Sequence, residues 1–444
     1  MPTATAPDIG RRLIRQLMTP GSDQLDSADL AQVRARGDFF QLTRDLHVSA
    51  TYEGCKAVLR HPAMLVEGAD QLDELGVSWR ESPAGRQIVN ELVLLEGEAH
   101  RVIRELVLRP FQAPRKVATR SIVTEVAAQQ VRCVGQALAR GESCDALEHF
   151  VRAVPLRVIC RLLGLSAEVG AQLATHMAPL SVFLSASFET GRTRDEADAA
   201  VEALAEIMTP ALRARASEPA DDLLGDLVTL RHERPDLVDD TRLLANALLL
   251  HAAGYETTVS HLAACLVRLG SDRTTLATLR ADPSRVVPFL REMERLAPPI
   301  QQTVRVAAED VQIRGTLLPA GCRVVVLIDG ANRDPALRPG SDPEQLDLQA
   351  PPVPSLAFGA GRHLCAGISL ARWESEAAIR GLVEHWPDFV SHADGSRFEL
   401  SNPHAHLTVR PARDGAPPPF GNPIAEVHLS AETERGGDRH EFRS

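Results

Sequence analysis

One segment in the C-terminal part of this chain constrains its fold more than any other. It reads SLAFGAGRHLCAGISLARWESEAAIRGLVEHW and places Cys365 between a glycine-dense loop and an amphipathic helix. Gly359 and Gly361 carry no Cβ, so the backbone there can turn sharply and approach a neighbouring group closely. Because N–H groups at a helix terminus stabilise a thiolate, Cys365 stands where its pKa would be lowered.

A thiolate held by a rigid glycine loop suits a haem iron. The simpler interpretation is a small buried apolar residue, which is the commoner fate of a single cysteine in an intracellular protein. The glycines around Cys365 favour the ligand interpretation, since a purely structural cysteine does not need them.

A second group of polar residues interrupts the most apolar stretch of the chain, in the sequence HAAGYETT. An acid followed by two threonines is unfavourable in the middle of a purely structural helix. The group could be a polar patch on a helix face. Alternatively, Gly254 leaves room for a flat ligand, Thr257 bonds a backbone carbonyl and opens the helix locally, and Glu256 relays protons from solvent.

Two ion-pair patterns complete the candidate chemistry. Glu292 and Arg295 lie three apart in FLREMERLAPP, either as an ordinary surface pair or, since two prolines follow, as a buried architectural pair. His100 and Arg104 lie one turn apart in HRVIR. They form either a solvated helix face or a site that holds a carboxylate through charge-assisted hydrogen bonds.

The hydrophobic pattern predicts a mainly α protein with a small β portion. Apolar residues recur three and four apart over most of 114–269, which is typical of amphipathic helices. β-Branched runs split by turn residues predict a small sheet over 311–332, and a strand pair is expected at 39–42 and 47–49. Residues 335–354 are rich in Pro, Gly and Asp, and predict a long irregular connection.

Composition excludes several classes of protein. A net charge of −11 argues against a general nucleic-acid binder. The seven cysteines are scattered without a C-x-x-C, which argues against a disulfide framework or a zinc knuckle. The longest apolar run, 243–254, is too short to cross a bilayer, and the first residues lack the apolar core of a secretory signal. We therefore expect a cytoplasmic protein that contacts neither nucleic acid nor membrane.

In this order, the motifs resemble those of the cytochrome P-450 family, in its soluble bacterial form. FGAGRHLCAG matches the family's cysteine loop, AGYETT its oxygen-binding helix, and HRVIR its haem-contacting helix. EMER with the later Arg305 matches its E-x-x-R region, and ANRDP the start of its meander. The resemblance implies a single large haem domain at 30–410, after an N-terminal extension at 1–29 and before a Pro/Gly-rich, loosely ordered tail at 411–444.

The resemblance also implies a role for each matching residue. Cys365 would be the axial ligand of haem b (iron protoporphyrin IX), Glu256 and Thr257 the acid–alcohol pair that delivers protons, and Glu292 with Arg295 a lock under the cysteine loop. The remaining cofactor-binding residues would be His100, Arg104, Arg305, His363, Gly254, Phe358, Gly359 and Gly361. The substrate pocket would draw on Leu249, Ala253, Gln301, Gln302, Thr303, Asn402 and His404.

The implied activity is a haem-thiolate monooxygenase that hydroxylates or epoxidises a small organic molecule, as a tailoring step in secondary metabolism. The same haem chemistry could instead serve a non-oxygenating oxidation, such as ring coupling, or nitration. A non-catalytic scaffold for a partner enzyme is less favoured, because it would need neither the thiolate of Cys365 nor the relay residues.

Electrons are expected from NAD(P)H through a separate ferredoxin and ferredoxin reductase, since no flavin fingerprint or iron–sulfur cysteine cluster is left over. A monomer is expected. Five cations lie close together in the sequence and form either a docking patch for an acidic ferredoxin or a solvated helix face. They are Arg101, Arg104, Arg109, Arg115 and Lys116.

The chain departs from the family pattern in its meander. Arg338 and Leu346 stand where the family usually has aromatic residues, and Gln349–Ala350 where it has an arginine. Ser355 stands where many bacterial members have a histidine. These departures leave open which third partner the Glu292–Arg295 pair would find.

Overall fold

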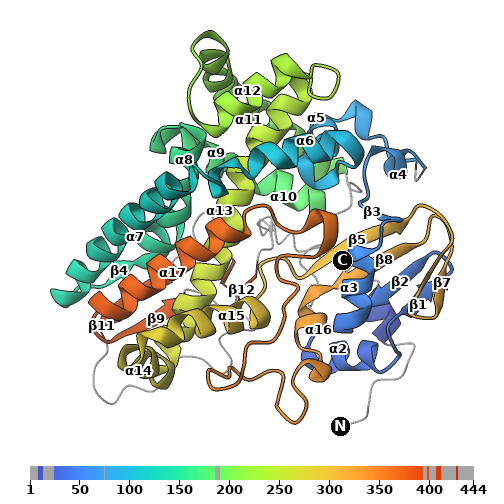
Figure 1. The fold of residues 1–444 in the computed structure, drawn as a ribbon. Helices are drawn as coiled ribbons and strands as arrows, with labels where there is room; N and C mark the ends of the chain where they lie inside the picture. Colours follow the sequence, from blue (N-terminus) through green and yellow to red (C-terminus); the bar gives the residue numbers. More distant parts are fainter. Residues whose placement is uncertain are drawn as a thin grey trace, which may run out of the picture.

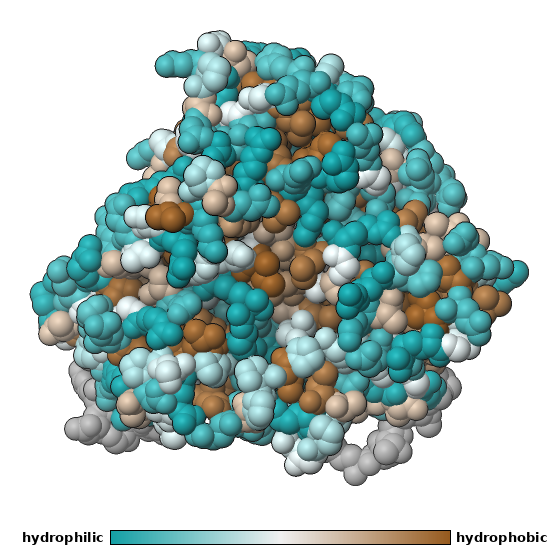
Figure 2. Space-filling view, in the orientation of Figure 1, coloured by the Kyte–Doolittle hydropathy of each residue, from teal (hydrophilic) through white to brown (hydrophobic). Residues whose placement is uncertain are grey.

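The computed structural model describes residues 9–13, 25–74, 76–185, 191–393, 398–399, 407–411 and 427–428. A larger helical part lies beside a smaller part that holds the main sheet (Figure 1). The face seen in Figure 1 is largely hydrophilic, with apolar side chains showing near its centre (Figure 2). The prediction of a mainly α chain with a small β portion is confirmed.

The helices follow the predicted amphipathic stretches. They are α2 Ser27–Arg34, α3 Tyr52–Arg60, α4 Ala69–Glu74, α5 Pro83–Val89, α6 Gly97–Val107, α7 Lys116–Ala139, α8 Ala153–Leu163, α9 Ala167–His176, α10 Ala178–Ser185, α11 Gly191–Ser217, α12 Leu223–Glu233, α13 Asp240–Ser271, α14 Arg273–Ala281, α15 Val286–Leu296, α16 Ile328–Asn332 and α17 Ile368–His385.

The strands are short. They are β1 Phe40–Thr43, β2 Leu46–Ser49, β3 Met64–Leu65, β4 Cys144–Asp145, β5 Gln302–Ala307, β6 Val311–Ile313, β7 Thr316–Leu318, β8 Arg323–Leu327, β9 Phe389–Ala393, β10 Phe398–Glu399, β11 Leu407–Pro411 and β12 Val427–His428.

The main sheet has five strands in the order β1-β2-β8-β5-β3. β2 and β8 are parallel, with Val48 opposite Val325, and the other pairs are antiparallel. The predicted strand pair forms as β1 and β2, and the predicted sheet segment forms the β6–β7 hairpin and β8. The prediction is wrong for Ile328–Asn332, which form α16 instead. Since β5 lies between β8 and β3, Arg305 is held in the interior of the sheet.

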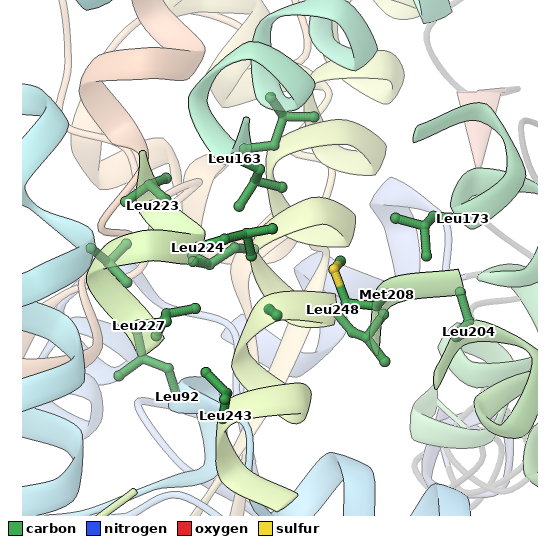
Figure 3. Packing of buried hydrophobic residues seen from close by; sticks show 14 of the residues in the cluster. Leu92, Leu163, Leu173, Leu204, Met208, Leu223, Leu224, Leu227, Leu243 and Leu248 are labelled. Carbon is green, nitrogen blue, oxygen red and sulfur yellow. The ribbon is translucent and has the colours of Figure 1, made fainter. Parts of the chain in front are cut away.

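α13 is the longest helix of the structure and forms its central axis (Figure 1). Leucines of α8, α9, α11 and α12 surround its first half (Figure 3). Each such buried side chain contributes about 1.5–3 kcal/mol relative to an exposed one. This packing fixes the position of the polar group on α13, which follows the leucines along the same helix.

α17 packs along α7 and crosses α13, so the helix that follows the cysteine loop is buried from two sides. A Cβ on Gly381 would lie 2.9 Å from Val131 Cγ2, which shows how closely α17 and α7 approach each other. The Trp386 Nε1–H after α17 donates to the Val131 carbonyl at 2.9 Å. The C-terminal end of α17 is therefore held closely against α7.

Between Arg338 and Ser355 the chain has no helix or strand, as predicted for this irregular connection. Within the described part of the chain, no helix combines the length and the apolar character that crossing a membrane requires.

Candidate functional site

The cysteine loop turns tightly ahead of α17. The N–H of Cys365 donates to the Phe358 carbonyl at 2.9 Å, and the N–H of Gly359 donates to the Leu356 carbonyl at 2.8 Å. Gly359 and Gly361 have φ angles of 69° and 72°, the left-handed region that glycine adopts without strain. A Cβ on Gly361 would collide with the carbonyl oxygen at the end of α3. Both glycines are thus required by the backbone, as predicted.

Cys365 is accessible to solvent although protein surrounds it. Burial raises the pKa of its thiol, whereas the N–H of Gly367, the Arg104 guanidinium and the N–H of Ile368 lower it. A side chain that is both accessible and desolvated borders a hollow in the protein rather than its outer surface. The two N–H groups confirm that Cys365 stands at the start of a helix.

Four of the other described cysteines are buried thiols, whereas Cys133 is exposed and Cys144 half-buried. Cys322, directly before the central strand β8 of the main sheet, is 1% exposed, and its Sγ lies 3.1 Å from His47 Nδ1. Burial raises the pKa of Cys322 to about 11, so that this thiol is neutral near pH 7. Cys55, Cys160 and Cys265 are also buried, with pKa values raised by burial.

Histidines and arginines converge beside the cysteine loop on a single carboxylate, Glu96. The rings of His100 and His363 lie 4.4 Å apart, and His363 Nε2 lies 3.3 Å from Glu96 Oε1. Arg362 Nη1 donates to Glu96 Oε2 at 3.0 Å. Burial opposes ionisation of Glu96, yet the hydrogen bonds from His363 and from the N–H of Val66 lower its pKa to about 2. Glu96 is therefore a carboxylate at physiological pH.

Among the described residues, no carboxylate is hydrogen-bonded to His100 or Arg305, and Glu96 acts on both only through its charge. His100 is 7% exposed, and its buried Nε2 has no hydrogen-bond partner. Burial lowers the pKa of His100 to about 4, and the positive charges of His363 and Arg104 act in the same direction. Arg305 Nη1 donates only to its neighbours, Thr303 Oγ1 at 3.1 Å and the Val304 carbonyl at 2.7 Å. These buried imidazole and guanidinium groups therefore suit a ligand that brings its own carboxylates.

Arg104 lies on the side of the cysteine loop. Its Nη2 donates to the Leu364 carbonyl at 2.6 Å, and its charge acts on Cys365. His100 and Arg104, predicted to act together from one face of α6, thus approach the loop from the same helix.

The polar group on α13 borders accessible space. Residues 258–267 of this helix are buried, whereas 252–257 are half-buried or exposed, and Ala253 is exposed. Thr257 Oγ1 donates to the Ala253 carbonyl at 3.1 Å, as predicted. The predicted local opening of the helix is wrong, since α13 is a continuous α-helix through this stretch. Glu256 accepts from Ser181 of α10 at 3.1 Å, and burial raises its pKa to about 7.

α17 connects this stretch of α13 to the cysteine loop. The buried carboxyl of Glu374 lies beside the Thr258 hydroxyl, nine positions after Cys365. α17 therefore links the cysteine loop at its start to the helix that carries the relay residues.

Gly254 has a different role from the predicted one. A Cβ on Gly254 would lie 2.7 Å from Ile159 Cδ1 of α8. The glycine is therefore needed for the contact between α13 and α8, and it does not leave room for a flat ligand.

The family model of cytochrome P450 (cytochrome P-450) matches residues 38–407 of the chain. The chain belongs to the cytochrome P-450 family.

Two curated relatives have named activities. The chain is 32% identical to the mycinamicin IV hydroxylase/epoxidase of Micromonospora griseorubida, over 69% of this chain and 76% of the relative. It is 31% identical to the 6-deoxyerythronolide B hydroxylase of Saccharopolyspora erythraea, over 65% and 68%. The solved structure of CYP164A2 from Mycobacterium smegmatis with econazole is 26% identical, with a TM-score of 0.73, over 90% of this chain and 99% of that one. The chain is a cytochrome P-450 monooxygenase.

The family uses a haem, and the described residues fit it. The accessible Cys365 offers a soft ligand, and the orphaned His100 Nε2 together with Arg305 offers donors for the two propionates. The ring of Phe358 lies between the loop and Arg372, whose guanidinium is 5.1 Å from the ring centroid.

The Glu292–Arg295 pair of this P-450 is buried, and its third partner is Arg338. Arg295 donates to Glu292 at 2.7 and 3.1 Å and to the meander carbonyls of Pro343 and Gln345. Arg338 reaches both Glu292 oxygens, at 3.2 and 3.4 Å. The residue that departs from the family pattern thus replaces the missing meander arginine.

The predicted pocket residues differ in their placement. Thr303 shares a strand face with Arg305, whereas Gln302 shares the opposite face with Val304, which packs against the apolar cluster under α2. Gln302 was predicted to line the pocket, but it lies on the strand face that is turned away from Arg305. Gln301 and Leu249 are half-buried. Asn402 and His404 lie outside the described residues.

Four of the five cations in the segment from Arg101 to Lys116, predicted as either a docking patch or a solvated helix face, bond other groups of the chain. Arg101 pairs with Glu98 and Glu105, Arg104 bonds the cysteine loop, and Arg109 and Arg115 share Asp226. Arg101, Arg109 and Arg115 thus have acidic partners within the chain, whereas Arg104 bonds a neutral carbonyl. Docking of a ferredoxin on this segment stays a prediction.

The site also contains residues that sequence reasoning missed. Glu96 lies one turn before His100 in EGEAHRVIR, where the spacing could have revealed it. No local pattern points to Ser181, because it comes from another helix and its partner lies 75 positions away.

Proposed function

We propose that this P-450 binds haem b through Cys365 and inserts one oxygen atom of O₂ into a small organic molecule, by hydroxylation or epoxidation. The observation that carries the proposal is the accessible, desolvated thiol of Cys365 at the start of α17, beside the buried His100 and Arg305, to which no described carboxylate is hydrogen-bonded. When bound, the haem supplies the reduction of O₂ and the transfer of oxygen to carbon.

Three groups of residues then bind the propionates, transfer the proton and exclude water. His100, Arg104, Arg305 and His363 bind and orient the propionates. Glu256 holds a proton at its carboxyl oxygens. Thr257 Oγ1, held by its hydrogen bond to the Ala253 carbonyl, orients the transfer of this proton toward the haem. The leucines around the first half of α13 exclude water from the apolar side of the site.

A tailoring step in secondary metabolism is supported by the two relatives named as hydroxylases. We further propose a cytoplasmic monomer that receives electrons from NAD(P)H through a ferredoxin and its reductase.

The ligand assignment is tested by the ferrous–CO spectrum of the loaded enzyme. Replacement of Cys365 by Ser is expected to abolish the thiolate-type Soret band. Cys322→Ser is the matched control, because it removes an equally sized thiol from the sheet, and it is expected to keep the band. A band that survives in Cys365→Ser and is lost in Cys322→Ser would overturn the assignment.

The reaction type is tested by the product mass after turnover with labelled O₂. Incorporation of one labelled oxygen is expected. Product formed without label would instead support the alternative, a coupling or other non-oxygenating oxidation on the same site.

A further inference from the structure

A hydroxyl group of α10 holds the carboxyl of Glu256 on α13. Ser181 Oγ lies 3.1 Å from one carboxyl oxygen of Glu256 and 3.3 Å from the other. On its other side, Ser181 Oγ lies 3.5 Å from the Met177 carbonyl. The hydroxyl therefore has two acceptors within reach, a titratable carboxyl and a fixed backbone carbonyl.

This arrangement satisfies Glu256 in either protonation state. A serine hydroxyl carries one proton and two lone pairs. When Glu256 is ionised, Ser181 donates its proton to the carboxylate. When Glu256 is protonated, its O–H can donate to Ser181 Oγ, whose own proton then turns to the Met177 carbonyl. Neither state leaves a buried donor without a partner, which would cost about 1–3 kcal/mol.

The other titratable groups around Glu256 do not take over this role. Glu91, after α5, is buried and bonded to Gln87 at 3.0 Å, and burial together with the charge of Glu256 raises its pKa to about 8. Tyr255 on α13 and Glu374 on α17 also have pKa values raised by burial. Burial raises the pKa of Glu256, and Ser181 is the group that opposes this shift.

We propose that Ser181 is a positioning residue for Glu256, whose hydroxyl keeps the carboxyl in one orientation in both protonation states and thereby links α10 to proton delivery. α10 packs on α9, α11 and α5, so any displacement of this part of the fold moves the hydroxyl relative to the carboxyl. The inference rests on the proposed role of Glu256 in oxygen activation.

The test is the titration of Glu256 in the loaded enzyme by infrared difference spectroscopy. The carbonyl stretch of the protonated carboxyl is assigned by its loss in Glu256→Gln. In Ser181→Ala the midpoint is expected to move upward by about one pH unit, the size of one hydrogen bond to a charged group. The fraction of electrons that reach product should also fall.

Two comparisons separate positioning from a merely structural effect. Ser181→Thr keeps the hydroxyl and is expected to restore the midpoint, whereas Ser181→Val, of nearly the same shape, is not. Ser260→Ala is the matched control, because Ser260 Oγ donates to the backbone carbonyl of Glu256 at 3.1 Å rather than to its carboxyl. Its midpoint should stay at the wild-type value.

The outcomes are distinguishable. An unchanged midpoint in both Ser181→Ala and Ser181→Val, with a normal ferrous–CO spectrum, would overturn the role of Ser181 and leave the proposed function standing. A wild-type enzyme without the thiolate-type band would overturn the proposed function itself.

Discussion

Arg338 should stabilise the fold through Glu292, although the family pattern has no arginine at its position. Its guanidinium makes two bonds of 3.2 and 3.4 Å to a carboxylate whose side chain is 6% exposed. Hydrogen bonds to a charged group contribute about 1.5–3 kcal/mol, and these are long, so Arg338→Ala should lower the free energy of unfolding by about 2 kcal/mol. Arg295→Ala should cost more, about 3–5 kcal/mol, because it leaves a buried carboxylate without its shortest partner.

The assay is equilibrium urea unfolding followed by far-UV circular dichroism at fixed haem content. In a Glu292→Gln background, the cost of Arg338→Ala should fall below about 1 kcal/mol, because the carboxylate that pairs with Arg338 has been removed. Arg380→Ala, which breaks an exposed pair with Glu376, is the control and should cost less than about 1 kcal/mol. An Arg338→Ala cost that is negligible, or equal in the two backgrounds, would refute the assignment.

Three further predictions concern charge and backbone. The pKa of Glu96 is lowered in the fold, so its stabilisation is present above about pH 4.5 and is lost as the pH falls toward 2; Glu96→Gln should flatten this acid limb of the stability profile. The pKa of Glu256 is raised to about 7, so stability should fall as the pH rises from 4.5 through 7, and Glu256→Gln should remove that loss in urea titrations at pH 5 and 8. Gly361→Ala should destabilise the fold by more than about 2 kcal/mol and reduce haem retention, measured by Soret absorbance after gel filtration, because its Cβ meets backbone at a positive φ; unchanged retention would contradict this.

The cysteine loop could be predicted because its chemistry is local. Positive φ at Gly359 and Gly361 and the helix start after Cys365 all follow from residues that are neighbours in sequence. The helical periodicity and the turn residues predicted the fold class for the same reason.

The features that sequence reasoning missed depend on residues far apart in the chain. Arg115 looked like part of a free basic surface until the fold placed it against Asp226, 111 positions away. Gly254 suggested room for a flat ligand, but in the structure the side chain of Ile159, from another helix, occupies that space. Periodicity reports which face of a helix is buried, and it cannot report which partner buries that face.

The excess of cations beside the cysteine loop has a consequence for the order of assembly. Without an anionic ligand, His100 and Arg305 are buried with no described carboxylate hydrogen-bonded to them, a situation that favours opening of this region. A ligand that binds only the folded chain stabilises it in proportion to the logarithm of its free concentration. The last stage of folding should therefore be set by haem supply, and chains made faster than haem is delivered should stay open at this corner and be cut there first by proteases.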